Sequence, residues 1–180
     1  MTNGTRRWIA IAIAAMALTV IGTIAGVIAL YHHPRVDPRL AEAFALAQRG
    51  DEDRALQLAR AHLADHPDDP DALVIAFLAD WWKSGVVDEL APRLDRVPLS
   101  AAQRAMIHGL ELIAQHREAD AIAALEAARK ASGDAVEILY ALGEAQWAAG
   151  QHDLARATLD QAFARDRRWQ MALRHAGAAK

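Results

Sequence analysis

Residues 109–155 read GLELIAQHREADAIAALEAARKASGDAVEILYALGEAQWAAGQHDLA, and the small residues in this segment recur at a regular spacing that indicates the fold. An interval of about 34 residues separates Gly109 from Gly143, and the same interval separates Ala121 from Ala155. Ala55 precedes Ala121 by close to two such intervals. Small residues that recur at this interval predict a row of helix–turn–helix units, each stacked on the next.

The ends of the helices can be placed from capping residues. Asp37-Pro38 and Asp69-Pro70 each set an N-cap carboxylate before a proline at the first helical position, where the absent N–H costs nothing. Ser100–Gln103 and Asp134–Glu137 have the spacing of a capping box, in which each side chain bonds the other residue's backbone N–H. Turns between helices are expected at Gly50, Gly85 and Gly150. These signals predict helices of roughly 12–16 residues joined by short turns.

Residues 37–180 resemble the tetratricopeptide repeat (TPR) family, whose unit is a helix–turn–helix of about 34 residues. The resemblance implies an all-α solenoid of about four repeats, each with a small residue where its two helices cross. The matching pairs are Ala43 with Ala55, Gly109 with Ala121, and Gly143 with Ala155. The family's turn glycine matches Gly50 and Gly150, and its late proline matches Pro67.

Two departures from the family pattern are visible. His116 stands where the third unit should have its turn glycine. Leu90-Ala91-Pro92 interrupts the second unit, so we expect a short or bent second helix there, because proline is tolerated only in a first turn. Residues 167–180 are expected to form a final capping helix that covers the apolar face of the last repeat.

Residues 8–31, WIAIAIAAMALTVIGTIAGVIALY, contain no charged side chain. A helix of this length extends about 36 Å, more than the roughly 30 Å hydrocarbon core of a bilayer. Trp8 and Tyr31 at its ends suit the membrane–water interface. We expect an uncleaved transmembrane signal-anchor helix here, after a short tail over residues 1–7 and before a linker over 32–36 and the repeat domain over 37–180.

Two alternatives exist for this segment, and neither fits as well. A cleaved signal peptide has a shorter apolar region, about 7–15 residues. A buried helix of a soluble protein normally shows one polar face. Arg6 and Arg7 before the span favour an inside N-terminus, although arginines on the other flank reduce the contrast. We therefore expect a single-pass protein of the inner (cell) membrane with an exported repeat domain, periplasmic in a Gram-negative cell.

Small residues at 3-4 spacing line one face of the expected membrane helix. They are Ala12, Ala15, Thr19, Gly22, Gly26 and Ala29. Such a ridge lets two helix backbones approach closely in lipid, which predicts a homodimer or contact with a partner helix. The alternative is chance, since the segment is rich in alanine.

Composition excludes several classes of function. Arg6, Arg7 and Arg35 are three of the 20 basic residues, and all 23 acidic residues follow residue 35, so the rest of the chain carries 17 basic residues and is net −6. An acidic domain argues against a nucleic-acid partner. The chain has no cysteine, and it lacks the glycine-rich and nucleophile motifs of common enzymes, so we predict neither catalysis nor a cofactor.

A metal site is not predicted either. His62 and His66 are one helical turn apart and share a face, but no third ligand is placed by spacing. A location at a solvated helix end explains the His62–His66 pair as well as metal binding does.

The TPR resemblance implies a concave groove, lined by the first helix of each repeat, that holds a peptide or helix of a partner. The corresponding positions are Gln103, Met106, Leu110, Ile113, Glu137, Tyr140, Glu144 and Trp147. The family's carboxylate-clamping basic and asparagine residues are missing from them, so an apolar groove with two acids suits a helix or a basic, apolar segment. The alternative is that Met106, Tyr140 and Trp147 fill the core.

The sequence thus predicts a membrane-anchored scaffold or adaptor for protein–protein interactions, by analogy in envelope protein assembly, secretion or cytochrome c maturation. Two other functions stay open: an oligomeric regulator that faces the cytoplasm, and an accessory subunit of a membrane enzyme complex.

Overall fold

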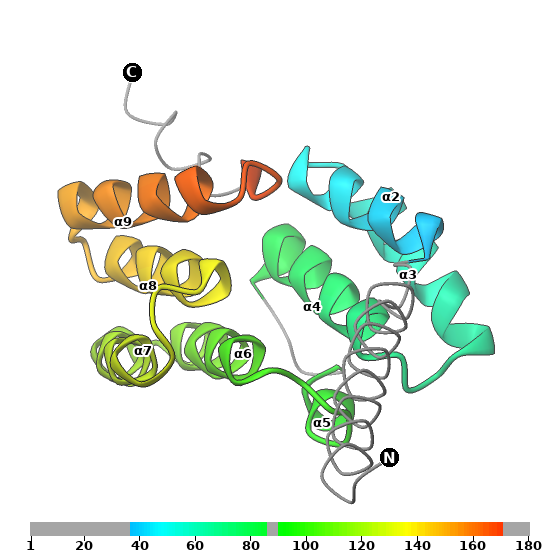
Figure 1. Ribbon diagram of the computed structural model, residues 1–180, viewed down its shortest axis with the longest axis horizontal. Coiled ribbons are helices and arrows are strands. Elements are labelled where there is room, and N and C mark those ends of the chain that lie inside the picture. Colours follow the sequence, from blue (N-terminus) through cyan, green and yellow to red (C-terminus); the bar gives the residue numbers. More distant parts are fainter. Residues whose placement is uncertain (1–36, 86–89, 171–180) are drawn as a thin grey trace, which may run out of the picture. The chain divides into compact units, whose positions relative to one another are not determined.

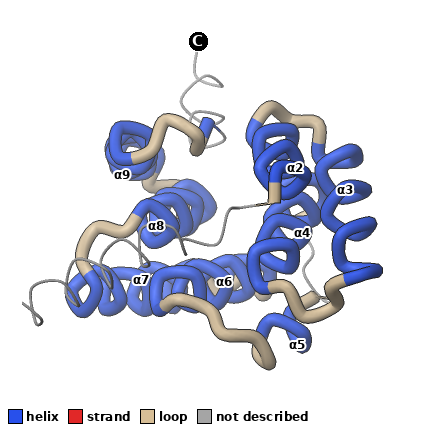
Figure 2. The backbone as a smooth tube through the Cα atoms, turned by 45° about the vertical axis from the view of Figure 1, so that its right-hand side comes forward, coloured by secondary structure: helices blue, strands red, loops and turns tan. Residues whose placement is uncertain are grey.

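The computed structural model describes residues 37–85 and 90–170, and the regular structure in these ranges is entirely helical (Figure 2). The eight helices are α2 (Pro38–Gln48), α3 (Glu52–Asp65), α4 (Pro70–Ser84), α5 (Ala91–Leu94), α6 (Ala101–Ala114), α7 (Glu118–Ser132), α8 (Val136–Ala148) and α9 (His152–Arg165). All belong to one compact unit, Asp37–Lys180. The expected all-α fold is confirmed for the described residues.

The helices pack in the order of the chain, as stacked repeats do. Each helix contacts the next within α2–α3–α4–α5 and within α6–α7–α8–α9. Helices two apart also touch, because α2 contacts α4 and α6 contacts α8. Figure 1 shows the two series as neighbouring stacks. This arrangement is the antiparallel, TPR-like packing that the period predicts.

Local capping chemistry explains where several helices begin. The Asp37 carboxylate accepts from the backbone N–H of Arg39, and the Asp69 carboxylate accepts from that of Ala72. Ser100 and Gln103 form the complete capping box at the start of α6. Each cap satisfies backbone donors that lack a partner inside the helix. These three predictions are confirmed.

The predicted capping box at Asp134–Glu137 is wrong. The N-cap of α8 is Ala135, and no side chain caps this helix end. The Asp134 carboxylate instead accepts from Arg129 Nε at 2.6 Å and from Arg165 Nη2 at 2.9 Å. Two guanidinium partners outcompete a neutral backbone N–H because charge-assisted hydrogen bonds are the stronger ones.

The two helix crossings at glycine follow the same plan in successive repeats. A Cβ placed on Gly143 would lie 2.5 Å from Leu159 side-chain atoms of α9 and 3.4 Å from the Ala155 carbonyl oxygen. A Cβ on Gly109 would lie 2.6 Å from Leu125 of α7. Leu125 and Leu159 are separated by the same interval as the two glycines. Both glycines thus lie where two helices approach closely, and the expected partner Ala155 is near Gly143. At Gly109 the nearest atoms belong to Leu125 and not to the expected partner Ala121.

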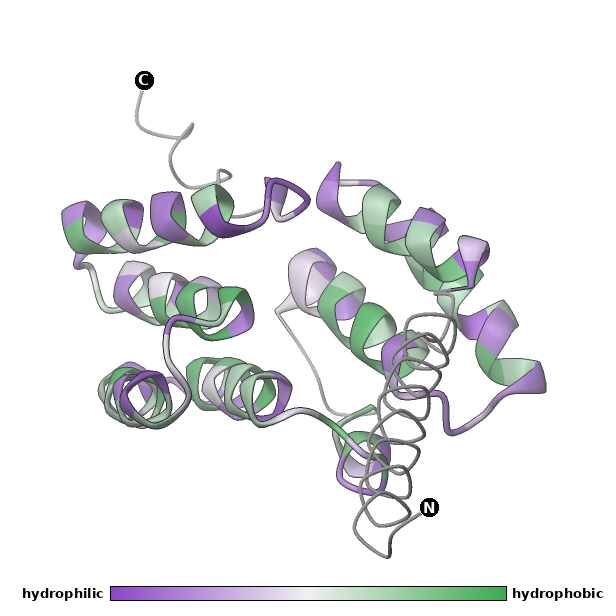
Figure 3. Cartoon of the chain, viewed as in Figure 1, coloured by the Kyte–Doolittle hydropathy of each residue, from purple (hydrophilic) through white to green (hydrophobic). Residues whose placement is uncertain are grey.

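The second repeat is irregular, as expected. Its second helix, α5, has only four residues and carries Pro92 in its first turn, where proline is tolerated. The first helix of this repeat, α4, compensates with an uninterrupted buried run over residues 72–79. In Figure 3, α4 is mostly in hydrophobic colours, whereas α9 alternates between hydrophilic and hydrophobic. α4 is therefore the most enclosed helix of its series.

The turns between helices use the left-handed backbone conformation. Gly50, Gly85 and Gly150 have φ of 85°, 68° and 77°, as their expected turn positions require. His116 adopts φ 56° at the place of the missing turn glycine in the third repeat. The repeat geometry is thus kept there by a residue for which this conformation is unfavourable.

Several predictions fall outside the described residues. The expected membrane helix over residues 8–31, its small-residue ridge and most of the expected capping helix over 167–180 are among them. Residues 166–170, which are described, form a turn after α9. Within 37–85 and 90–170, no helix combines the length and apolarity needed to cross a bilayer.

Candidate functional site

The predicted groove positions lie on two helices that pack against each other. Gln103, Met106, Leu110 and Ile113 follow one face of α6, and Glu137, Tyr140, Glu144 and Trp147 follow one face of α8. α6 and α8 are in contact. The family alignment therefore selects a stripe of residues on neighbouring first helices.

Burial divides this stripe into two classes. Met106 and Leu110 have no exposed surface, and Tyr140 is 1% exposed, so these three belong to the core. The other five are half-buried: Gln103, Ile113, Glu137, Glu144 and Trp147. The part of the stripe that solvent reaches thus offers two carboxylates, one amide, one isoleucine and one indole ring.

Four aromatic rings from distant parts of the chain are joined by a series of contacts through Tyr140 and Trp169. We call this set, Phe44, Trp82, Tyr140 and Trp169, the aromatic cluster. The Tyr140 ring centroid lies 6.1 Å from that of Trp82 in α4 and 5.2 Å from that of Trp169, which follows α9. The Trp169 centroid is also 5.6 Å from that of Phe44 in α2. The cluster joins α2 and α4 to α8 and the last described turn, through edge-to-face and tilted contacts that rings favour.

The Tyr140 hydroxyl is the polar centre of the cluster. It accepts a hydrogen bond from Trp82 Nε1 at 2.6 Å. Burial raises the pKa of the Tyr140 hydroxyl well above its usual value, and the negative charge of Glu144 raises it further. Tyr140 therefore stays protonated and can donate to the Glu144 carboxylate, which links the buried rings to a half-exposed acid.

The sequence prediction includes Tyr140 and misses its ring partners. Phe44 sits at the equivalent groove position of the first repeat, but the prediction draws only on the better-aligned repeats. Trp82 is one of two adjacent tryptophans on α4, which point about 100° apart, and its neighbour Trp81 is only half-buried. Trp169 lies beyond the repeat pattern, so its isolation as an aromatic residue among arginines is the only signal in the sequence.

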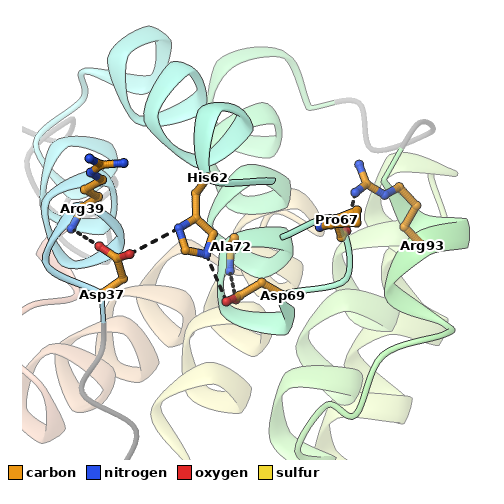
Figure 4. A network of polar contacts seen from close by, with 7 residues as sticks. All are labelled: Asp37, Arg39, His62, Pro67, Asp69, Ala72 and Arg93. Atoms are coloured by element: carbon orange, nitrogen blue, oxygen red, sulfur yellow. Dashed lines mark hydrogen bonds and ion pairs between the residues drawn. The ribbon is translucent and has the colours of Figure 1, made fainter. Parts of the chain in front are cut away.

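A second polar network lies at the start of α2 and α4 (Figure 4). His62 of α3 is 8% exposed, and its Nδ1 is 3.4 Å from Asp37 Oδ2 while its Nε2 is 3.1 Å from Asp69 Oδ2. Asp37 and Asp69 are the N-cap residues of α2 and α4. His62 therefore links the N-terminal ends of α2 and α4, the first helices of two successive repeats.

Hydrogen bonding lowers the pKa of Asp69 despite its partial burial. Burial alone would raise the pKa, but the Ala72 N–H and His62 both stabilise the carboxylate, and the net shift is downward. The His66 ring lies 4.8 Å from that of His62. Because His62 contacts the carboxylates that begin α2 and α4, we assign this network a structural role.

One comparison with known proteins bears on the chain. Residues 112–176 match the family model described as Tetratricopeptide repeat. Comparisons with curated proteins and with solved structures returned no significant match. The matched region includes α7, α8 and α9, which agrees with the resemblance drawn from the spacing of small residues. Residues 112–176 are therefore similar to a tetratricopeptide repeat region, a type of helical scaffold for contacts between proteins.

Proposed function

We propose that this chain is a membrane-anchored adaptor whose repeats hold a partner protein beside the bilayer. Two features support the proposal. The TPR match over residues 112–176 indicates a protein-binding scaffold. The uncharged sequence over residues 8–31 is long enough to anchor it in a membrane.

The observation that carries the proposal is the half-exposed part of the predicted groove. Glu137 and Glu144 stand on α8 beside Trp147, and Ile113 stands on the neighbouring α6. Carboxylates next to half-buried apolar side chains suit a partner helix or strand with basic and apolar residues. The net charge of −6 after residue 35 adds a favourable long-range field for such a partner.

A photo-crosslinking amino acid at Trp147 tests the proposal in intact cells. We expect a specific adduct, and Glu137→Gln with Glu144→Gln should reduce its yield several-fold because the partner loses both charges. The matched control is Glu126→Gln with Asp160→Asn on α7 and α9, which should leave the yield unchanged. No adduct from Trp147, or an equal loss in both double variants, would contradict the proposed groove.

Topology is the second part of the proposal. We propose that the repeats are exported, in a setting such as envelope protein assembly, secretion or cytochrome c maturation, because Arg6 and Arg7 directly precede the span. Protease added to spheroplasts should then digest the repeat domain. Protection that ends only on lysis would reverse the orientation and favour the cytoplasm-facing regulator.

A further inference from the structure

Trp169 is the one member of the aromatic cluster that no helix carries. Phe44, Trp82 and Tyr140 lie on α2, α4 and α8, whereas Trp169 lies in the turn that follows α9. Its indole is nevertheless only 5% exposed. A side chain from the edge of the described fold thus packs against rings carried by α2 and α8, and Trp82 of α4 packs in turn against Tyr140.

The turn that carries Trp169 is held mostly by short-range contacts. The Asp166 carboxylate accepts from the backbone N–H and the guanidinium of Arg168, and the Trp169 N–H donates to the Asp166 carbonyl oxygen at 3.0 Å. Arg167 and Arg168 are exposed. Withdrawing the indole therefore requires a change in one turn, whereas moving any other ring of the cluster requires moving a helix.

We propose that Phe44 and Tyr140, with Trp82 packed against Tyr140, form a socket for a tryptophan side chain of a partner, and that Trp169 occupies this socket in the free chain. The inference rests on the proposed function, since the partner would bind along the proposed groove. The sequence around Trp169 indicates the chemistry of the partner. We expect a tryptophan directly preceded by basic residues, as Arg167 and Arg168 precede Trp169.

Charge and geometry support this choice of occupant. The Glu144 carboxylate is half-exposed and is coupled to the Tyr140 hydroxyl at the wall of the socket. A basic residue beside the incoming indole would meet a negative charge there, and an indole matches the edge-to-face and tilted ring contacts that Trp169 makes. Trp169 is then an autoinhibitory contact that a partner must displace.

The socket can be tested with the chain's own sequence, without knowing the partner. The full chain in detergent micelles, as wild type and as Trp169→Ala, is titrated with a labelled peptide of residues 163–170, FARDRRWQ. We expect W169A to bind this peptide at least about tenfold more tightly than it binds FARDRRAQ. Wild type should bind FARDRRWQ at least about tenfold more weakly than W169A does, because its socket is filled.

Trp147→Ala is the matched control, because it removes an indole that packs on His152 at 4.5 Å, outside the cluster. It should not gain affinity for FARDRRWQ. Trp169→Leu, which leaves a smaller apolar side chain, is tested in parallel, and the comparison uses each variant that keeps the helical circular dichroism of the wild type.

Equal affinity for the two peptides, or a gain in W147A as large as in W169A, would overturn the socket. This result does not depend on the crosslinking experiment. If W169A binds FARDRRWQ selectively but Trp147 gives no adduct, the proposed groove is wrong and the socket stands. If Trp147 gives an adduct but W169A does not distinguish the two peptides, the proposed role of Trp169 is wrong.

Discussion

At the scale of single residues, His62 connects the first two repeats. One imidazole contacts the N-cap carboxylates of the first helices of two successive repeats. Asp69 serves both as a helix cap and as a partner of His62. Because its pKa is lowered in the folded protein, Asp69 stabilises the fold above its unfolded-state pKa, and this contribution is lost as the pH falls through the folded-state pKa.

Asp69→Asn separates these two roles. Asparagine keeps the acceptor that an N-cap needs but carries no charge. The variant should be less stable than wild type at pH 7, and the difference should shrink as the pH falls below the ordinary value of 3.8. Urea unfolding followed by circular dichroism from pH 7 to pH 3 measures it. Asp68→Asn, at an exposed neighbour, is the control, and a difference independent of pH would refute the linkage.

His116 is the residue with unfavourable backbone geometry in the repeat turns. Its φ of 56° lies in the left-handed region. The corresponding turns have glycine: Gly50 two repeats earlier and Gly150 one repeat later. His116→Gly should stabilise the chain by about 0.5–1 kcal/mol, because the left-handed conformation carries no steric penalty for glycine. Gly150→Ala should do the opposite, since a Cβ there meets nothing within 4 Å and only the backbone is strained. Thermal melts of both variants measure the two shifts, and a shift of the same sign in both would contradict this interpretation.

At the scale of elements, the spacing of paired helices depends on the glycine crossings. Gly143 lets α8 approach α9 so closely that Leu159 occupies the place of its missing side chain. Gly109 does the same for Leu125 between α6 and α7. Each of the last two repeats thus has one glycine–leucine pair at its helix crossing, Gly109 with Leu125 and Gly143 with Leu159.

Gly143→Ala should therefore destabilise the chain by about 1–3 kcal/mol, the usual range for overpacking. Its Cβ would force Leu159 and the backbone of α9 to shift. Ala148→Leu adds a larger side chain at an exposed site of the same helix and should change the free energy of unfolding by less than about 0.5 kcal/mol. Urea midpoints compare the two, and an equal effect would show that crossing distance is not the cause.

At the scale of the molecule, the aromatic cluster joins the two helix series. The Trp82–Tyr140 hydrogen bond is a buried polar link between α4 and α8. Phe44 and Trp169 connect the first repeat to the turn after the last described helix. The two series should consequently unfold together, since separating them exposes four rings at once.

Tyr140→Phe tests this coupling with little change in volume. It removes the oxygen that accepts from Trp82 Nε1 and should cost about 1–3 kcal/mol, the penalty for a buried donor that loses its acceptor. Wild-type unfolding should give coincident transitions by circular dichroism and tryptophan fluorescence. Separate transitions in the wild type would show that the cluster does not couple the two series.

Local patterns in the sequence were sufficient to place the features that short-range chemistry controls. Caps at Asp37, Asp69 and Ser100 begin helices because the bonds involved join residues that are close neighbours in the chain. The regular spacing of small residues predicted stacked helix pairs, because close crossing demands small residues at fixed intervals. Pro92 limited α5 for the same local reason.

Contacts between residues far apart in the chain depend on how the helices pack, and local patterns do not reveal them. Asp134 had the spacing of a cap, yet Arg165 at the end of α9 helps draw it into ion pairs. The division of the groove stripe into buried and exposed positions depends on what packs above it, as with Tyr140 under Trp82 and Trp169. Phe44 of the first described helix meets Trp169 of the last described turn, and no local pattern encodes that contact, because it arises only when the stacked repeats bring the two ends of the array together.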